Sequence, residues 1–252
     1  MSGILQKAKN DEVPWEQQTA TRQIETRQLR RRFLVISEGG ETEPIYFKAF
    51  ERILPSGTVK IETCGTGRNT LSLVKEVASI RARLERKLGF AFDEVWTVFD
   101  KDSFKREDFD NAIHSCVSHK YGAAWSNECF EIWYLLHFNN RQTGVGRDAI
   151  FRELEKEFNT RGYRRLKGKA GLSIHEGMAK HANQGLAITR AKRLFLEKNP
   201  PGQSPEDPPS RQNPCTTVYK LVEKLLACRP KYLTPTENRN RKPVSQKHKS
   251  RK

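Results

Sequence analysis

The stretch FLVISEGGETEPIYFKAF, residues 33–50, joins a predicted strand to a predicted helix. Its first five residues, FLVIS (33–37), form a continuous apolar run, which is typical of a strand covered on both faces. The Gly-Gly pair that follows allows the main chain to turn tightly. Thr42 can cap the next helix, in which apolar residues recur at helical spacing as far as Leu54. The stretch therefore predicts one strand-turn-helix unit.

Three more units of the same kind follow along the chain. Strands are predicted at 59–64, 94–100 and 122–126, and the segments after them have helical periodicity, at 71–81, 107–121 and 127–138. This alternation predicts an α/β fold with a mainly parallel sheet, helices on both faces and right-handed crossovers. In such sheets, ligands bind beyond the carboxyl ends of the strands.

The second half of the chain has a different character. Helices are predicted at 148–158, with Asp148 as the cap, at 173–198 and at 216–228, with a Pro-rich loop at 199–214. We therefore divide the chain into four parts: a polar N-terminal segment (1–30), an α/β core (31–140), a helical extension packed on that core (141–230) and a basic tail (231–252) that we expect to be disordered.

The charge of the chain favours a polyanionic partner. It has 46 Lys and Arg against 30 Asp and Glu, a formal net charge of +16, and neutralising phosphates with such cations releases counterions. No apolar run of about 18 residues is present, so we expect no membrane partner. The first residues lack the pattern of a signal peptide, and the five cysteines are scattered, so we expect reduced thiols in the cytoplasm.

Acidic residues follow two of the predicted strands. Glu38 comes directly after the first strand, and Asp100 and Asp102 lie at and just beyond the end of the third. A spacing of two puts both aspartates on the same side of an extended chain. If the first and third strands are near neighbours, the three carboxylates converge, and they repel each other unless a divalent cation lies between them.

Carboxylate oxygens without His or Cys favour Mg²⁺ or Mn²⁺ over zinc. One or two such ions can activate water and stabilise the leaving oxygen in phosphodiester cleavage. Glu41, Glu43, Glu128 and Glu131 begin the helices after the first and fourth strands, so they could reach the same edge. The alternative is a turn with helix-capping acids, in which Glu43 is an acid favoured by the helix dipole.

Five segments resemble the successive motifs of the RloB family, in the right order over roughly residues 30–230. They are FLVISEGGETEPIYFKAF, GTGRNTLSLVKE, DEVWTVFDKDSF, SNECFEIWYLLHF and NPCTTVYKLVEKL. RloB proteins are similar to Toprim-fold proteins, a group that includes topoisomerases, primases and OLD-type nucleases. They are associated with restriction loci and abortive phage resistance, sometimes beside an ABC-type ATPase.

The resemblance implies a Toprim-like fold for residues 31–140 and roles for individual acids. A glutamate after the first strand and a later DxD bind Mg²⁺ in the Toprim pattern, which implies that Glu38, Asp100 and Asp102 are catalytic metal ligands. Glu43 and Glu131 match acids that could complete a second metal position. The family segment usually reads SNPCFE, and Glu128 replaces its proline here.

Basic residues near these motifs are candidates for nucleic-acid binding. Lys101 lies between the two aspartates, and Arg68 lies in the loop-to-helix junction CGTGRNT (64–70), whose amides could meet a phosphate. The segment RGYRRLKGK interleaves an aromatic residue with cations that could grip a strand: Tyr163, Arg164, Arg165, Lys167 and Lys169. A simple turn and a solvated loop are the alternatives. His137 is predicted to be a core or helix-end residue rather than a catalytic base.

Our leading hypothesis is a Mg²⁺-dependent nuclease that hydrolyses phosphodiesters in defence against phage. The alternative is a nucleic-acid-binding effector subunit, non-catalytic or active only under certain conditions, that works with an ABC-type ATPase. A structural binder driven by the basic tail is a third option. The sequence leaves open whether the substrate is DNA, RNA or tRNA, and whether the chain forms a homo-oligomer.

Overall fold

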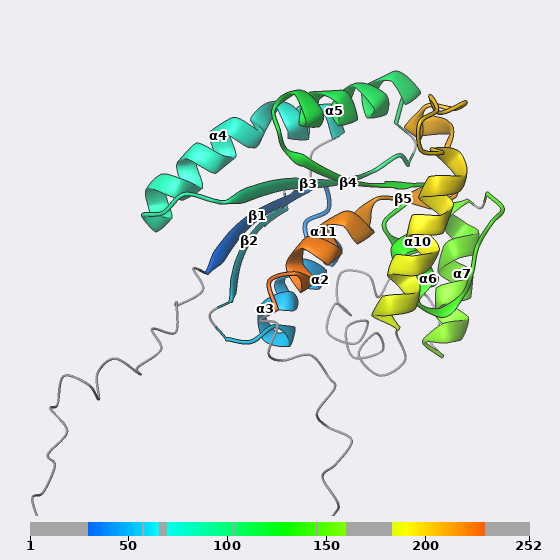
Figure 1. Cartoon of the computed structure of the whole chain (residues 1–252), viewed down its shortest axis with the longest axis horizontal. Coiled ribbons are helices and arrows are strands. Elements are labelled where there is room, and N and C mark those ends of the chain that lie inside the picture. The colour runs from blue at the N-terminus through cyan, green and yellow to red at the C-terminus, as the bar shows by residue number, and fades with distance from the viewer. Residues whose placement is uncertain are drawn as a thin grey trace, which may run out of the picture.

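A five-stranded sheet forms the centre of the computed structural model, which describes residues 30–229 except 57, 66–69, 103, 145 and 160–182. The strand order is β2-β1-β3-β4-β5 (Figure 1). Four strands are parallel, namely β1 (Arg31–Ser37), β2 (Val59–Gly65), β3 (Glu94–Asp100) and β4 (Gly122–Asn127), and β5 (Cys215–Thr216) runs antiparallel to β4. The predicted α/β fold with a mainly parallel sheet is confirmed.

Helices cover both faces of the sheet (Figure 1). One face carries α4 (Thr70–Leu88) and α5 (Arg106–Ser118). The other face carries α2 (Thr42–Lys48), α3 (Phe50–Ile53), α6 (Glu131–Phe138), α7 (Arg147–Glu157), α10 (Gln184–Lys198) and α11 (Val218–Leu226). No helix in the described ranges is long and apolar enough to cross a membrane.

The continuous apolar run of β1 is explained by burial on both sides. Phe33 and Val35 belong to the hydrophobic cluster shared with α2, α6, α7, α10 and α11, whereas Leu34 and Ile36 belong to the cluster shared with α4 and α5. Because successive side chains of a strand point to opposite faces, a strand between two helical layers needs an apolar residue at every position.

Several predicted element boundaries are corrected by the structure. Thr42 is the first residue of α2 rather than its cap, and Glu41 at the N-cap position makes no side-chain capping bond. The helix predicted up to Leu54 is divided into α2 and α3. Gly146, rather than Asp148, occupies the N-cap of α7.

The segment after Ser126 differs more strongly from the prediction. It leaves β4 through a turn, and α6 starts only at Glu131, so the predicted helix from residue 127 is too long. The predicted start of the helix at 173–198 lies outside the described residues, in which α10 begins at Gln184. The last helix starts at Val218, because the residues before it pair with β4 as β5.

The Pro-rich loop is anchored to the core rather than merely joining two helices. It contains the 3₁₀ helix η1 (Pro209–Arg211), in which the main-chain N–H and the hydroxyl of Ser210 both donate to the carboxylate of Asp110 on α5, over 2.9 and 2.7 Å. The side-chain amide of Asn127 donates to the carbonyls of Pro209 and Ser210. The segments 1–29 and 230–252 lie outside the described residues.

Candidate functional site

The carboxyl edge of β1 and β3 is the point at which the strand order of the sheet reverses. The chain passes from β1 outward to β2 and then back across to β3 on the other side of β1 (Figure 1). β1 and β3 are direct neighbours, and Glu38 N–H donates to Val98 O over 2.9 Å. Open α/β sheets bind ligands in the crevice at such a switch point. The predicted convergence of the acids requires the first and third strands to be neighbours, and they are.

Close approach of main chain and side chains explains the glycines at this edge. A Cβ added at Gly39 would lie 2.2 Å from Oε2 of Glu43, so the Glu43 carboxylate packs directly on the turn after β1. A Cβ added at Gly65, the last residue of β2, would lie 2.5 Å from Cα of Gly40. The Ser37 hydroxyl donates to Gly39 O over 2.7 Å and closes the turn. The turn therefore places Glu43 against the end of the sheet.

Three buried carboxylates converge beside this turn, from α2, β3 and α6. Glu43 is 5% exposed, Asp100 is 8% exposed and Glu131 is 0% exposed. Burial raises the pKa of the Cys129 thiol, and Glu131 and Asp100 raise it further. Burial also raises the pKa of Tyr134, to which Glu131 and Glu43 again contribute. Glu131 therefore shares a neighbour with each of the other two acids, Cys129 with Asp100 and Tyr134 with Glu43.

Arg147, the first residue of α7, joins the two aspartates of the DxD motif. Its Nη1 lies 2.8 Å from Oδ2 of Asp102, and its Nη2 lies 3.9 Å from Oδ2 of Asp100. The sequence analysis missed this residue. A signal was present, because a cation in the first turn of a helix is disfavoured by the helix dipole and so suggests an acidic partner elsewhere.

The route by which the two aspartates meet differs from the prediction. The chain is not extended through Asp102, whose φ of 38° lies in the left-handed region. Lys101 N–H donates to Ser126 O over 2.8 Å, and Asp102 N–H donates to Glu128 O over 3.0 Å, so the turn is fastened to the end of β4. The two aspartates share Arg147 because the chain turns there, and not because they alternate along a strand.

The other predicted residues have different placements. Glu38 is half-buried at the switch point, and Glu128 lies at the end of β4, where burial and the neighbouring Asp102 raise its pKa. His137 is a core residue, in which burial lowers the pKa to about 4. The predicted nucleic-acid contacts Arg68, Tyr163, Arg164, Arg165, Lys167 and Lys169 lie outside the described residues.

A cavity of about 260 Å³ opens beside the DxD turn. It is lined by Lys101, Arg106, Asn127, Glu128, Ser210, Arg211 and Asn213. Of the predicted nucleic-acid contacts, Lys101 is the one that the described part of the chain contains. The Lys101 ammonium donates to the carbonyls of Phe104 and Asp102, over 2.6 and 3.1 Å, which holds it at the mouth of the turn.

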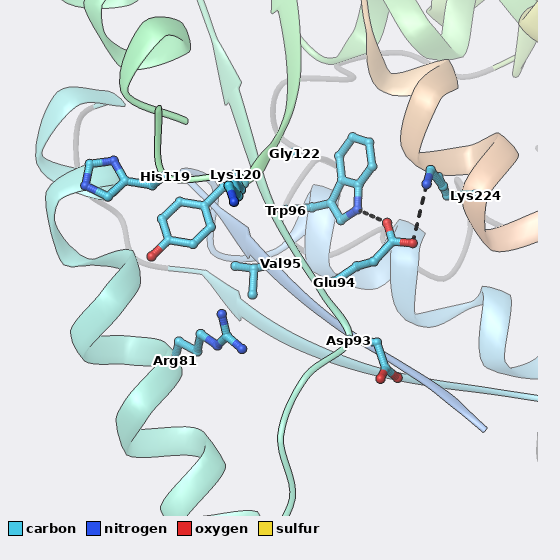
Figure 2. Close-up of a pocket in the computed structure, with 10 residues that line it drawn as sticks. Arg81, Asp93, Glu94, Val95, Trp96, His119, Lys120, Gly122 and Lys224 are labelled. Carbon is cyan, nitrogen blue, oxygen red and sulfur yellow. Dashed lines mark hydrogen bonds and ion pairs between the residues drawn. The ribbon is translucent and has the colours of Figure 1, made fainter. Parts of the chain in front are cut away.

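A second cavity, of about 320 Å³, lies at the opposite, amino-terminal edge of β3 and β4 (Figure 2). One of its two acids, Glu94, accepts a hydrogen bond from Trp96 Nε1 over 2.9 Å and pairs with Lys224 at 3.6 Å and Arg31 at 2.7 Å. None of the predicted site residues lines it. The candidate site is therefore the carboxyl edge of the sheet.

The comparison with protein families gives a clear result. A family described as RloB-like protein matches residues 33–225. The chain belongs to the RloB-like family. No curated protein and no solved structure matches it. The match spans β1 through α11 and so includes the carboxylates, Arg147 and the basic cavity of this RloB-like chain.

The donor chemistry of the site fits a hard divalent cation. The converging side chains are carboxylates, which are the ligands that Mg²⁺ and Mn²⁺ prefer. Among the described residues, no three His, Cys, Asp or Glu side chains are grouped closely enough to hold a metal ion. Asp102 is directed at Arg147 instead. Metal binding through the DxD motif therefore requires Asp102 to exchange the guanidinium for the ion.

Proposed function

We propose that this RloB-like chain is a Mg²⁺- or Mn²⁺-dependent nuclease of Toprim type that acts in defence against phage. The observation that carries the proposal is that three buried acids, Glu43, Asp100 and Glu131, lie at the carboxyl edge of a mainly parallel sheet, beside its switch point. Buried carboxylates are costly together unless cations balance them. The defence role rests on the family resemblance alone.

Each residue of the site has a distinct part in this proposal. Asp100 and Asp102, with Glu38, would hold one ion, and Glu43 and Glu131 would serve a second position. A bound divalent ion supplies an activated water and stabilises the leaving oxygen in phosphodiester hydrolysis. Arg147 binds Asp102 before metal enters and is then placed to pair with a phosphate oxygen, since a guanidinium fork suits both anions.

The test is cleavage of DNA, RNA and tRNA by the purified full chain with Mg²⁺ or Mn²⁺. Asp100→Asn is close to isosteric, so we expect a folded protein whose cleavage rate falls at least about 100-fold, since a lost ligand costs several kcal/mol. Glu223→Gln is the matched control, because this acid of α11 forms a largely exposed pair with Lys192 of α10. Cleavage by Asp100→Asn at the wild-type rate would contradict the assignment of Asp100 as a catalytic metal ligand.

A second function is favoured by the ion pair between Arg147 and the DxD motif. A guanidinium on these carboxylates suits an inactive or non-catalytic subunit, which we propose would act with a separate ABC-type ATPase. Under this alternative, the isolated chain binds nucleic acid but cleaves none of the three substrates. Cleavage that appears only when the ATPase is added supports it, and cleavage by the isolated chain contradicts it.

A further inference from the structure

The cavity beside the DxD turn has the composition of an anion site. Three of its lining side chains are the cations Lys101, Arg106 and Arg211, and one, Glu128, is an acid. The side-chain amide of Asn213 donates to Oε2 of Glu128 over 3.4 Å, so this carboxylate already has a partner within the cavity wall. The cavity is thus a basic hollow directly next to an acidic site.

The cations of the cavity keep most of their charge for a ligand. Lys101 donates to two main-chain carbonyls, which orient the ammonium without neutralising it. Arg211 has Asp207 as a distant partner at 3.9 Å, with both side chains more than half exposed. Arg106, at the start of α5, has no ion-pair partner in the described ranges.

The walls of the cavity are held firmly in place. Asp110 on α5 holds η1 through both polar groups of Ser210, and Asn127 holds it from β4. Gln212, next in the chain after Arg211, donates to Asn199 Oδ1 and Asp207 O over 3.0 and 2.8 Å. A preorganised set of donors loses less entropy on binding than a mobile one.

We infer that this cavity binds a phosphate of the substrate strand that flanks the phosphate to be cleaved. The inference deepens the proposed nuclease function and rests on it. Guanidinium groups bind phosphate oxygens through two parallel hydrogen bonds, and the fixed ammonium of Lys101 adds a point charge. Lys101 lines the cavity and lies between Asp100 and Asp102 in the chain, so a phosphate bound here lies beside the DxD turn.

The test measures binding without cleavage. A fluorescent single-stranded DNA of about 20 nucleotides is titrated with the full chain in EDTA at several salt concentrations, followed by anisotropy. For Arg106→Gln/Arg211→Gln we expect an affinity about tenfold or more lower, because hydrogen bonds to charged groups are lost. The slope of log affinity against log salt should fall by about 0.7, the value for one phosphate contact to a single strand.

The control variant is Arg86→Gln/Lys87→Gln, which removes the same charge from the last turn of α4, before the amino-terminal end of β3. We expect it to bind almost as the wild type does. An equal loss in both variants, or an unchanged Arg106→Gln/Arg211→Gln, overturns the inference, as does a wild type that does not bind the DNA. Melting temperatures of both variants exclude a folding defect.

Two further measurements test the nuclease proposal and a free-anion site separately from the strand-binding inference. Asp100→Asn should keep DNA binding in EDTA, and its cleavage rate decides the nuclease proposal independently of the cavity. Inorganic phosphate should compete only weakly with the DNA, because the strand makes contacts beyond the cavity. Inorganic phosphate that binds as tightly as the oligonucleotide, with binding lost in Arg106→Gln/Arg211→Gln, would identify a free-anion site and overturn the assignment to a strand.

Discussion

Arg147 is the residue at which the observed ion pairs and the proposed metal binding would compete. Its guanidinium lies 2.8 Å from Oδ2 of Asp102, the atom that a metal ion would need. We expect Arg147→Gln to bind Mn²⁺ about tenfold more tightly than the wild type, because a charged hydrogen bond of about 1.5 kcal/mol no longer has to be broken. Calorimetric titration with Mn²⁺ measures this directly.

Arg141→Gln is the matched control, because Arg141 lies shortly before α7 and pairs with Glu153 rather than with the DxD motif. It removes the same charge and should leave the Mn²⁺ affinity nearly unchanged. Equal affinities for wild type and Arg147→Gln would mean that the guanidinium does not obstruct the ion.

His137 makes the stability of the protein sensitive to acid. Burial lowers its pKa to about 4 in the folded chain, whereas the ordinary value is 6.5. The unfolded chain therefore binds a proton that the folded chain does not bind between these values, so stability falls as the pH drops below about 6.5. From pH 7.5 to pH 5, we expect this group to cost about 2 kcal/mol.

Urea unfolding at the two pH values measures the effect. His137→Gln should lose about 2 kcal/mol less than the wild type over this range, and His119→Gln, at an exposed histidine stacked on Tyr121, should behave like the wild type. Identical losses in wild type and His137→Gln would show that His137 does not titrate on unfolding.

Among the elements, β2 and the β1–α2 turn are coupled through their glycines. Gly65→Ala places a Cβ 2.5 Å from Cα of Gly40, and main chain cannot move aside as a side chain can. We expect a loss of about 1–3 kcal/mol in unfolding free energy, the range for overpacking. Gly40→Ala is the control, since its Cβ would meet nothing within 4 Å. A Gly65→Ala protein as stable as Gly40→Ala in urea would show that the turn is not packed in this way.

The elements also show which structures a sequence can predict. β1 and β3 were predicted as strands, and both are buried on two faces, whereas β2 was predicted from alternating residues, of which Val59 and Ile61 are buried. β5 has two residues and lies after a Pro-rich loop, so no periodicity can indicate it. η1 is positioned by Asp110, 100 residues earlier in the chain, and such a tertiary hydrogen bond has no local signal.

The same distinction applies to the residues of the candidate site. Glu38, Asp100 and Glu131 were predicted because strand ends and helix starts of a parallel sheet meet at one edge. Arg147 and Arg211 were not predicted, because their approach to the DxD turn depends on how α7 and η1 fold back onto the sheet. Topology predicts the acids of the site, and tertiary packing supplies its cations.

At the scale of the whole molecule, the basic tail and the site should contribute separately to nucleic-acid binding. Removing residues 239–252 deletes seven Lys and Arg and no acid, which lowers the formal net charge from +16 to +9. We expect weaker binding of every sequence equally, with a salt slope lower by up to about 5 for single strands, because contacts to phosphates carry no sequence information. Cleavage at saturating substrate should remain, because the carboxylates lie in the folded core.

Anisotropy titrations and single-turnover cleavage of the truncated chain measure both quantities. A truncated chain that binds as tightly as the full chain would place the whole electrostatic contribution in the remaining residues, and one that binds but no longer cleaves would make the tail part of the site.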